Sequence, residues 1–331
     1  MKALFRLDTG GKFGLGHLMR SKALADALAK LGIVCTFAVK HIHSDNALLP
    51  HQLLFINTED EFLTYAQSYD VIIVDHYDYS SENFYALSQL SHSILVILDD
   101  ECNRGPLYAD IIINPIANSD LFNYADLAAD ARLLSGPQYI LLRDVFHKVK
   151  ALPFRARKSI IITFGGSDIS NLTLAVLKKI SRTKLASEHI IVVSGAACSQ
   201  VAMIADYCRQ HGFEHRHNVA DMAALFATAK LAISAAGSTA FELAYSGVPA
   251  VFAVVADNQL ESIKEQLNHG WCAMVDCRKS NKADELLSLA AAMIQSEKLE
   301  SYSQLARSLI DGKGAERIAL EISQRAERCV Q

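Results

Sequence analysis

Short, unbroken apolar runs that stop at a polar or glycine-rich cluster recur along this chain and constrain its fold most. Val71–Val74 is followed at once by Asp75-His76-Tyr77, and Ser159–Phe164 leads directly into Gly165-Gly166-Ser167. Strands that are covered by helices on both faces of a sheet read as continuous apolar runs. The pattern therefore predicts an α/β protein with parallel sheets, in which the polar clusters gather beyond the carboxyl ends of the strands.

The length of the chain favours two such units. It has 331 residues, whereas one hydrophobic core rarely serves more than about 250–300 residues. Hydrophobic residues make up 51% of the sequence, which is enough to fill two cores. A basic stretch around Pro153, over residues 148–158, is typical of a linker. We therefore expect a first domain over residues 1–150 and a second over residues 158–331.

Composition excludes several classes of partner. The formal net charge is −4 and the pI about 6.3, which is not typical of a general binder of nucleic acid or of membrane surfaces. The seven cysteines are scattered, odd in number and without a Cys-x-x-Cys pair, which favours a reducing compartment. We therefore expect a cytoplasmic protein.

Two further patterns are better explained by ordinary structure than by a special site. The most apolar window, residues 231–255, is interrupted by Glu242 and Pro249, so we expect no membrane insertion. His215 and His217 have no cysteine or acidic third ligand close by in the sequence, so we expect no metal.

A histidine lies where a predicted strand gives way to a predicted helix. Gly14-Leu15-Gly16-His17 follows an apolar run over residues 2–7 and precedes the helical spacing that begins at Leu18. The positive end of a helix dipole disfavours imidazolium, so His17 would be a neutral base that can accept a proton. The glycines would leave room for a ligand. The alternative is that Gly14 and Gly16 only form a turn and that His17 only caps the helix.

Two glycine-serine loops in the second domain, Gly165-Gly166-Ser167 and Gly237-Ser238-Thr239, each precede a predicted helix. Backbone N–H groups at such a helix start can bind an anion. Glu242 lies three residues beyond Thr239, so its carboxylate can accept hydrogen bonds from both hydroxyls of a ribose. Together they predict a nucleoside diphosphate in this domain, although each loop alone could be only a turn.

Several polar residues of the first domain should share one rim, while their individual roles stay open. Asp75 either orients a neighbouring side chain or only ends a strand. Arg20 either binds substrate or pairs with a local carboxylate such as Asp8. His76 is either a sugar contact or a structural residue. Ligands of such sheets bind beyond the carboxyl ends of the strands, which we call the strand-end rule. The residues that this rule places at the rim are His17, Asp75, His76, Tyr77, Asp99 and Asp100.

In their order along the chain, these motifs resemble the PseG family, the UDP-2,4-diacetamido-2,4,6-trideoxy-β-L-altropyranose hydrolases of pseudaminic acid biosynthesis, and the resemblance covers essentially the whole chain. The segments that carry it are Phe5-Arg6-Leu7-Asp8, Gly14-Leu15-Gly16-His17 with Arg20, Val74-Asp75-His76-Tyr77, Phe164-Gly165-Gly166-Ser167-Asp168 with Asn171, and Asp257-Asn258-Gln259. The resemblance implies the GT-B fold of proteins such as MurG, in which two Rossmann-like domains with parallel sheets face a central cleft. The last helix of that fold usually crosses back to the first domain.

The resemblance also implies an activity and roles for single residues. The reaction would be hydrolysis of the sugar C1–O bond with inversion, releasing UDP without a metal or a cofactor. His17 would be the base that activates water, and Tyr77 would contact the sugar or the attacking water. Asn258 and Gln259 would lie near the sugar or the diphosphate. The implied partner is a UDP-sugar.

Two other functions fit the same motifs. A GT-B glycosyltransferase that uses a UDP-amino sugar would need an acceptor and would release little UDP without one. A non-catalytic protein that binds nucleotide sugars would show no turnover, and the histidine argues against it.

Overall fold

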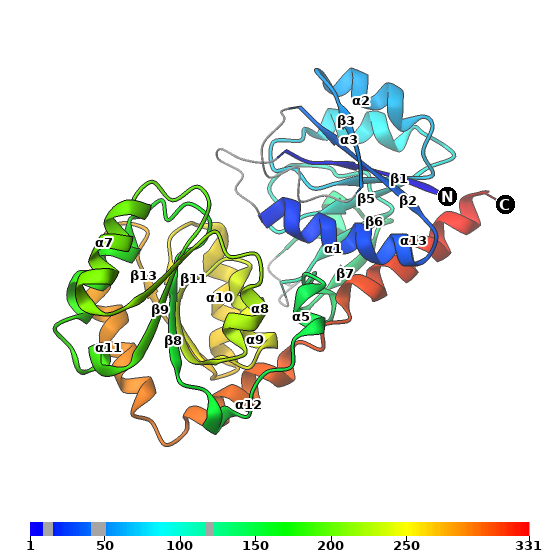
Figure 1. The fold of residues 1–331 in the computed structure, drawn as a ribbon. Helices are drawn as coiled ribbons and strands as arrows, with labels where there is room; N and C mark the ends of the chain where they lie inside the picture. The colour runs from blue at the N-terminus through cyan, green and yellow to red at the C-terminus, as the bar shows by residue number, and fades with distance from the viewer. Residues whose placement is uncertain (9–15, 41–50, 117–121, 331) are drawn as a thin grey trace. The chain divides into compact units, whose positions relative to one another are not determined.

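The computed structural model describes residues 1–8, 16–40, 51–116 and 122–330, and the chain divides into two compact units. Unit 1 consists of Met1–Asp144 and Gly312–Gln331, and unit 2 consists of Val145–Asp311. The chain leaves unit 1 a few residues before the expected boundary at residue 150, and its last helix belongs to unit 1. Each unit contains one parallel sheet flanked by helices, which confirms the expected α/β class (Figure 1).

The sheet of unit 1 has seven strands in the order β3-β2-β1-β4-β5-β6-β7. The central strand β1 pairs in parallel with β2 and β4, so that Phe5 lies opposite Phe37 on one side and Ile73 on the other. The strands are β1 (Lys2–Arg6), β2 (Val34–Val39), β3 (Gln52–Phe55), β4 (Val71–Val74), β5 (Ile94–Leu98), β6 (Ile111–Asn114) and β7 (Arg132–Ser135). The residues of β4, β5 and β6 are all buried, which explains their unbroken apolar runs.

Helices cover both faces of this sheet. They are α1 (Gly16–Lys30), α2 (Glu59–Ala66), α3 (Ser81–Ser88), α4 (Tyr124–Leu127) and α13 (Gly314–Val330), with the 3-10 turn η3 (Pro137–Tyr139). Leu24 of α1 and Ile318 of α13 share one core with the sheet, while Phe62 of α2 belongs to the core on the other face. A Cβ at Gly314 would lie 2.2 Å from the carbonyl oxygen of Ile140, so α13 can begin here only with glycine.

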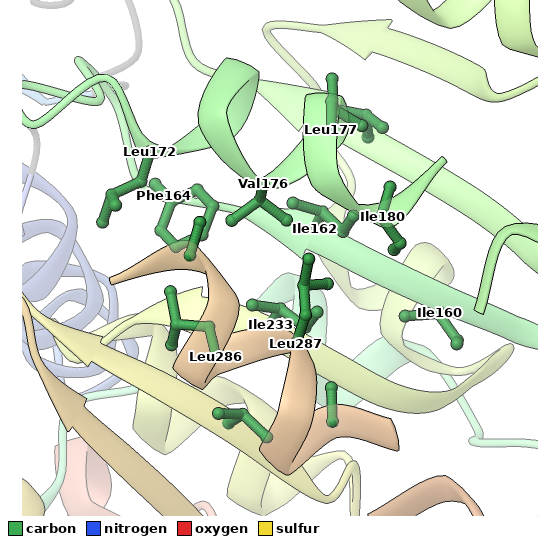
Figure 2. Packing of buried hydrophobic residues seen from close by; sticks show 14 of the residues in the cluster. Ile160, Ile162, Phe164, Leu172, Val176, Leu177, Ile180, Ile233, Leu286 and Leu287 are labelled. Atoms are coloured by element: carbon green, nitrogen blue, oxygen red, sulfur yellow. The ribbon is translucent and has the colours of Figure 1, made fainter. Parts of the chain in front are cut away.

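The sheet of unit 2 has six strands in the order β10-β9-β8-β11-β12-β13. The strands are β8 (Ser159–Thr163), β9 (His189–Ser194), β10 (Glu214–His217), β11 (Ala229–Ala235), β12 (Ala250–Val254) and β13 (Cys272–Asp276). The helices are α5 (Val145–Lys148), η4 (Phe154–Ala156), α6 (Leu172–Ile180), η5 (Lys184–Ser187), α7 (Val201–His211), α8 (Met222–Phe226), α9 (Thr239–Tyr245), α10 (Asn258–Asn268), α11 (Ala283–Ile294) and α12 (Leu299–Leu309). Ile162 of β8, Val176 of α6 and Leu287 of α11 meet in its core (Figure 2).

Each sheet contains one place where the chain reverses its direction of travel across the sheet. In unit 1 this place lies between β1 and β4, and in unit 2 it lies between β8 and β11. Ligands of open α/β sheets bind beyond the carboxyl ends of the strands at such a switch point. Residues that follow β1, β4, β8 and β11 are therefore the first to consider as a site.

No helix in the described parts of the chain is both long and apolar enough to cross a membrane.

Candidate active site

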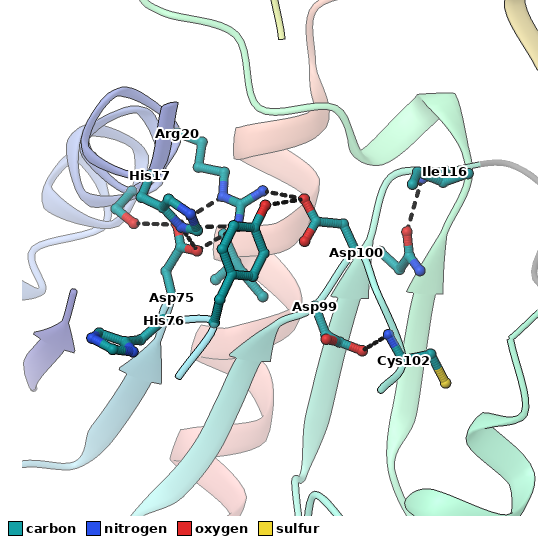
Figure 3. Close-up of polar contacts among 12 residues, drawn as sticks. His17, Arg20, Asp75, His76, Asp99, Asp100, Cys102 and Ile116 are labelled. Atoms are coloured by element: carbon teal, nitrogen blue, oxygen red, sulfur yellow. Dashed lines mark hydrogen bonds and ion pairs between the residues drawn. The ribbon is translucent and has the colours of Figure 1, made fainter. Parts of the chain in front are cut away.

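A buried histidine–carboxylate pair lies at the switch point of unit 1. His17 occupies the first turn of α1 and is only 5% exposed. Asp75 is the first residue after β4, and its Oδ1 lies 2.5 Å from His17 Nδ1 (Figure 3). Gly16 begins α1, whereas Gly14 lies outside the described residues. Of the two readings of Asp75, the contact with His17 favours the one in which it orients a neighbour.

Asp75 is the centre of a dense hydrogen-bond network. Arg20 donates to it from Nε at 2.7 Å and from Nη2 at 2.5 Å, and Ser21 Oγ donates at 3.0 Å. Burial alone would raise the pKa of this carboxyl, but the charge of Arg20 and the hydrogen bonds from Arg20 and His17 hold its pKa well below the usual range. Asp75 is therefore ionised in the folded protein.

Arg20 links this pair to a second carboxylate. Its Nη1 donates to Asp100 Oδ2 at 2.9 Å. Burial lowers the pKa of Arg20, but the charges of Asp75 and Asp100 outweigh that effect and raise its pKa well above the ordinary value. Arg20 therefore pairs with local carboxylates, as one of its two alternatives states, but its partners are Asp75 and Asp100. Asp8, the partner suggested from the sequence, is bonded by Arg6 and His76 instead.

The network around Asp75 determines which nitrogen of His17 can act as a base. An ionised carboxylate only accepts hydrogen bonds, so His17 Nδ1 must carry the proton that it shares with Asp75 Oδ1. Arg20 Nη2 also lies 3.2 Å from Nδ1, but both groups are donors and both direct their protons to Asp75. In the neutral form of the ring, Nε2 is then the nitrogen that can accept a proton, and the Asp75 carboxylate can stabilise the imidazolium that forms.

Tyr77 packs against the histidine. The two rings meet edge to face, with 4.4 Å between their centroids and 81° between their planes. The hydroxyl of Tyr77 donates to Asp100 Oδ2 at 3.0 Å, the same oxygen that Arg20 reaches. The strand-end rule placed Asp100 at this rim because β5 is the neighbour of β4, but no sequence pattern identified its two donors.

The other polar residues of the rim, His76 and Asp99, have structural partners of their own. His76 Nε2 lies 2.9 Å from Asp8 Oδ2, so its side chain has a structural partner. Burial would raise the pKa of Asp8, but the hydrogen bonds from His76 and Arg6 bring it well below the usual range. Asp99 accepts from Arg104 at 2.5 Å and from the Tyr124 hydroxyl at 2.7 Å. These contacts hold the loops that carry Asp75, Tyr77 and Asp100.

The two glycine-serine loops of unit 2 follow neighbouring strands. Gly165-Gly166-Ser167 leaves β8, and Gly237-Ser238-Thr239 leaves β11, which pairs with β8 in parallel. Gly165 has φ +82°, and both it and Gly166 are exposed. A Cβ at Gly195 would lie 2.4 Å from the backbone of Gly166, so the loop after β9 packs tightly beneath the first of these loops.

The first N–H groups of α6 already have a hydrogen-bond partner. The Asp168 carboxylate accepts the N–H groups of Leu172 at 2.9 Å and Thr173 at 3.0 Å. Asp168 thus takes these two N–H groups, which lie beyond the loop residues Gly165-Gly166-Ser167 that we predict to hold an anion. An anion at this loop would be left with the N–H groups of Gly165, Gly166 and Ser167.

Gln259 lies beside the second loop. Its Oε1 accepts the N–H of Val255 at 3.0 Å, and its Nε2 is 3.9 Å from the point where a Cβ of Gly237 would lie. Asn258 begins α10 and is exposed, and Glu242 lies half-buried on α9. The loops after β8, β11 and β12 thus gather the predicted residues of unit 2 at the carboxyl ends of three adjacent strands.

His215 and His217 share a hydroxyl partner. His215 Nε2 lies 2.8 Å and His217 Nδ1 lies 3.3 Å from the hydroxyl of Ser194. Burial lowers the pKa of His215, and the neighbouring His217 lowers it further.

Residues 160–313 match the model of the glycosyltransferase family 28 C-terminal domain. An uncharacterised protein of Methanocaldococcus jannaschii is 28% identical over 280 residues, which are 79% of this chain and 57% of that protein. The UDP-2,4-diacetamido-2,4,6-trideoxy-β-L-altropyranose hydrolase of Campylobacter jejuni is 24% identical over 192 residues, 56% of this chain and 68% of that enzyme. A Helicobacter pylori protein named as a pseudaminic acid cytidylyltransferase and the same hydrolase is 27% identical over 258 residues, 76% of this chain and 44% of its own.

The resemblance to the PseG hydrolases is thus confirmed by relatives that carry that name, although this chain spans only about half the length of two of the three proteins. Among solved structures, MurG of Acinetobacter baumannii has a TM-score of 0.69 over 98% of this chain and 100% of its own, at 15% identity. At that identity the likeness shows the fold, and it confirms the expected GT-B class.

Proposed function

We propose that this chain, a relative of the PseG hydrolases with the fold of MurG, hydrolyses the C1–O bond of a UDP-linked amino sugar. The observation that carries the proposal is the buried His17–Asp75 pair, in which the carboxylate fixes the orientation of a histidine that can act as a base. The expected substrate is UDP-2,4-diacetamido-2,4,6-trideoxy-β-L-altropyranose, the compound in the names of two relatives. The products are UDP and the free sugar, and the step belongs to pseudaminic acid biosynthesis.

The proposed reaction requires mainly a base that is correctly placed to activate water. His17 Nε2 takes a proton from a water molecule while the water oxygen forms a bond to C1. The C1–O bond to the diphosphate breaks, and its electron pair leaves with UDP. Attack from the face opposite the leaving group inverts C1, and Asp75 stabilises the imidazolium that results. Because a diphosphate is a good leaving group, most of the acceleration comes from positioning and from stabilising charge.

The UDP part of the substrate is assigned to unit 2. Backbone N–H groups of Gly165-Gly166-Ser167 and of Gly237-Ser238-Thr239, together with the hydroxyls of the second loop, would hold the diphosphate. The Glu242 carboxylate would accept hydrogen bonds from the two ribose hydroxyls. Asn258 and Gln259 would bond the sugar or the diphosphate, and the position of Gln259 beside Gly237 supports this assignment.

Transfer of the sugar to an acceptor is the second candidate function. The match to a glycosyltransferase C-terminal domain favours it. The same His17–Asp75 pair would then deprotonate an acceptor hydroxyl in place of water. The two reactions differ in one requirement, because only hydrolysis releases UDP at full rate without an acceptor.

Release of UDP in acceptor-free buffer tests the proposal. We expect steady turnover of the diacetamido UDP-sugar by the wild-type chain, and a loss of at least about a thousandfold in His17→Asn or His17→Ala. His51→Asn is the matched control, because His51 also pairs with an aspartate of α1, Asp26, at 2.9 Å. Turnover that is unchanged in His17→Asn would contradict the role of His17, and turnover that appears only with an acceptor would favour the transferase.

A further inference from the structure

Asp100 holds the hydroxyl of Tyr77 through one oxygen only. Its Oδ2 accepts from Tyr77 Oη at 3.0 Å and from Arg20 Nη1 at 2.9 Å. Its Oδ1 is buried and has no hydrogen-bond partner in the part of the chain that the structure describes. A buried acceptor without a partner costs free energy, so this carboxylate is not placed for stability alone.

The contact fixes the direction of the Tyr77 hydroxyl proton. A carboxylate that is paired with a guanidinium has no proton to give, so Tyr77 must be the donor in its bond to Asp100. The phenolic oxygen of Tyr77 can then only accept further hydrogen bonds. The Tyr77 and His17 rings meet edge to face with 4.4 Å between their centroids, so the phenol lies directly beside the proposed base.

We infer that Asp100 is a positioning residue that makes Tyr77 a hydrogen-bond acceptor for the attacking water, an inference that rests on the proposed hydrolysis. The water gives one proton to His17 Nε2 and donates its other hydrogen to Tyr77 Oη. This leaves an oxygen lone pair for C1. Tyr77 neither gains nor loses a proton in the step, and Asp100 acts only through Tyr77.

This assignment separates two roles that were open for Tyr77. A tyrosine that donated its proton to a sugar amide or to the diphosphate would have to give up its bond to Asp100. With that bond in place, Tyr77 aligns water and does not donate to the substrate. Removal of its hydroxyl should therefore lower kcat more than it raises KM.

A double-mutant cycle of Tyr77→Phe and Asp100→Ala tests the inference. We expect each single variant to lower kcat about 10- to 100-fold, with KM changed less than about threefold, since misalignment of a reacting group costs factors of this size. The double variant should match Tyr77→Phe alone, because Asp100 has nothing left to orient. The kcat of Asp100→Asn should fall less than about tenfold, because the amide oxygen of asparagine can still accept a hydrogen bond from Tyr77.

A second measurement does not depend on turnover. In protein labelled with ¹³Cζ-tyrosine, the Tyr77 resonance is the one that disappears in Tyr77→Phe. It should shift in Asp100→Ala and shift much less in Asp100→Asn. An unshifted resonance in Asp100→Ala would overturn the hydrogen bond on which the inference depends.

The outcomes separate the inference from the function. If the wild-type chain releases UDP without an acceptor but the two kcat losses multiply in the double variant, Asp100 acts through Arg20 or the fold, and only the inference fails. If the wild-type chain releases no UDP, the proposed function fails and the inference is overturned with it.

Discussion

Replacement of Asp75 by asparagine perturbs the proposed base without changing the size of the side chain. Within the described part of the chain, the Asp75 carboxylate accepts four hydrogen bonds, from His17 Nδ1, Ser21 Oγ and two nitrogens of Arg20. Asparagine has one acceptor oxygen and one NH2 group that donates. Its NH2 group must therefore take the place of either Oδ1 or Oδ2, where it meets other donors and no acceptor.

The loss of activity follows from which side the amide takes. On the Oδ1 side it faces His17 Nδ1, and the ring responds by carrying its proton on Nε2, where it cannot accept one from water. A wrong tautomer of this kind costs about 10⁴-fold in kcat. On the Oδ2 side the tautomer survives, but the imidazolium loses a full countercharge, which we take as about 10²-fold. We therefore predict a loss of about 10²- to 10⁴-fold.

The assay is acceptor-free release of UDP, together with the Kd of UDP by calorimetry. The Kd should change less than about threefold, since the proposed contacts to UDP lie in unit 2. Asp26→Asn is the matched control, because it alters a second histidine–aspartate pair nine residues further along α1, about 13 Å from His17 along the helix axis.

A kcat within about tenfold of wild type in Asp75→Asn would refute the reasoning. It would mean that His17 does not depend on this carboxylate for its tautomer or its charge. An equal loss in Asp26→Asn would refute it as well, because the effect would then not belong to the site.

Three further predictions concern stability and the loop Gly165-Gly166-Ser167. The pKa of Asp75 is depressed in the folded state, so its contribution to stability should be fully present above the unfolded-state pKa of about 3.9 and be lost as the pH falls through the folded-state pKa. The difference in unfolding free energy between wild type and Asp75→Asn, measured in urea, should therefore shrink below about pH 4. Gly195→Ala should weaken UDP binding about tenfold or more in calorimetry, because its Cβ would come within 2.4 Å of Gly166 and displace that loop; unchanged affinity would exclude the loop from the diphosphate site. Gly314→Ala should lower the unfolding free energy by about 2 kcal/mol or more, because its Cβ would lie 2.2 Å from the Ile140 oxygen; a melting temperature equal to wild type would contradict the close contact.

The strands that sequence predicts best are those buried on both faces. The sequence predicts Val71–Val74 at the bounds that the structure has, and residues 159–164 to within one residue of β8, because these apolar runs end sharply at polar or glycine residues. The helix α10 (Asn258–Asn268) was not expected, since only Ile263 and Gln266 of it are buried. The strand β13 (Cys272–Asp276) was missed because most of its residues are only half-buried at the edge of the sheet.

In the candidate site, too, the sequence predicts some features and not others. Strand ends predicted that His17, Asp75 and Asp100 share a rim, because backbone positions follow from the order of strands. Which carboxylate each arginine selects depends on side-chain geometry, so the pairing of Arg20 with Asp75 could not be read from spacing. The cap that Asp168 forms on α6 could not be predicted from the sequence for the same reason.

The most direct test of the central claim is a ¹H NMR time course of the anomeric proton of the diacetamido UDP-sugar, in buffer without an acceptor. With the wild-type chain, we predict that the signal of the UDP-sugar decays and that the free sugar appears first as the anomer inverted at C1, while His17→Asn leaves the UDP-sugar intact. A substrate signal that persists with the wild-type chain, a product that first appears with retained configuration, or equal decay with His17→Asn would contradict hydrolysis by water that His17 activates.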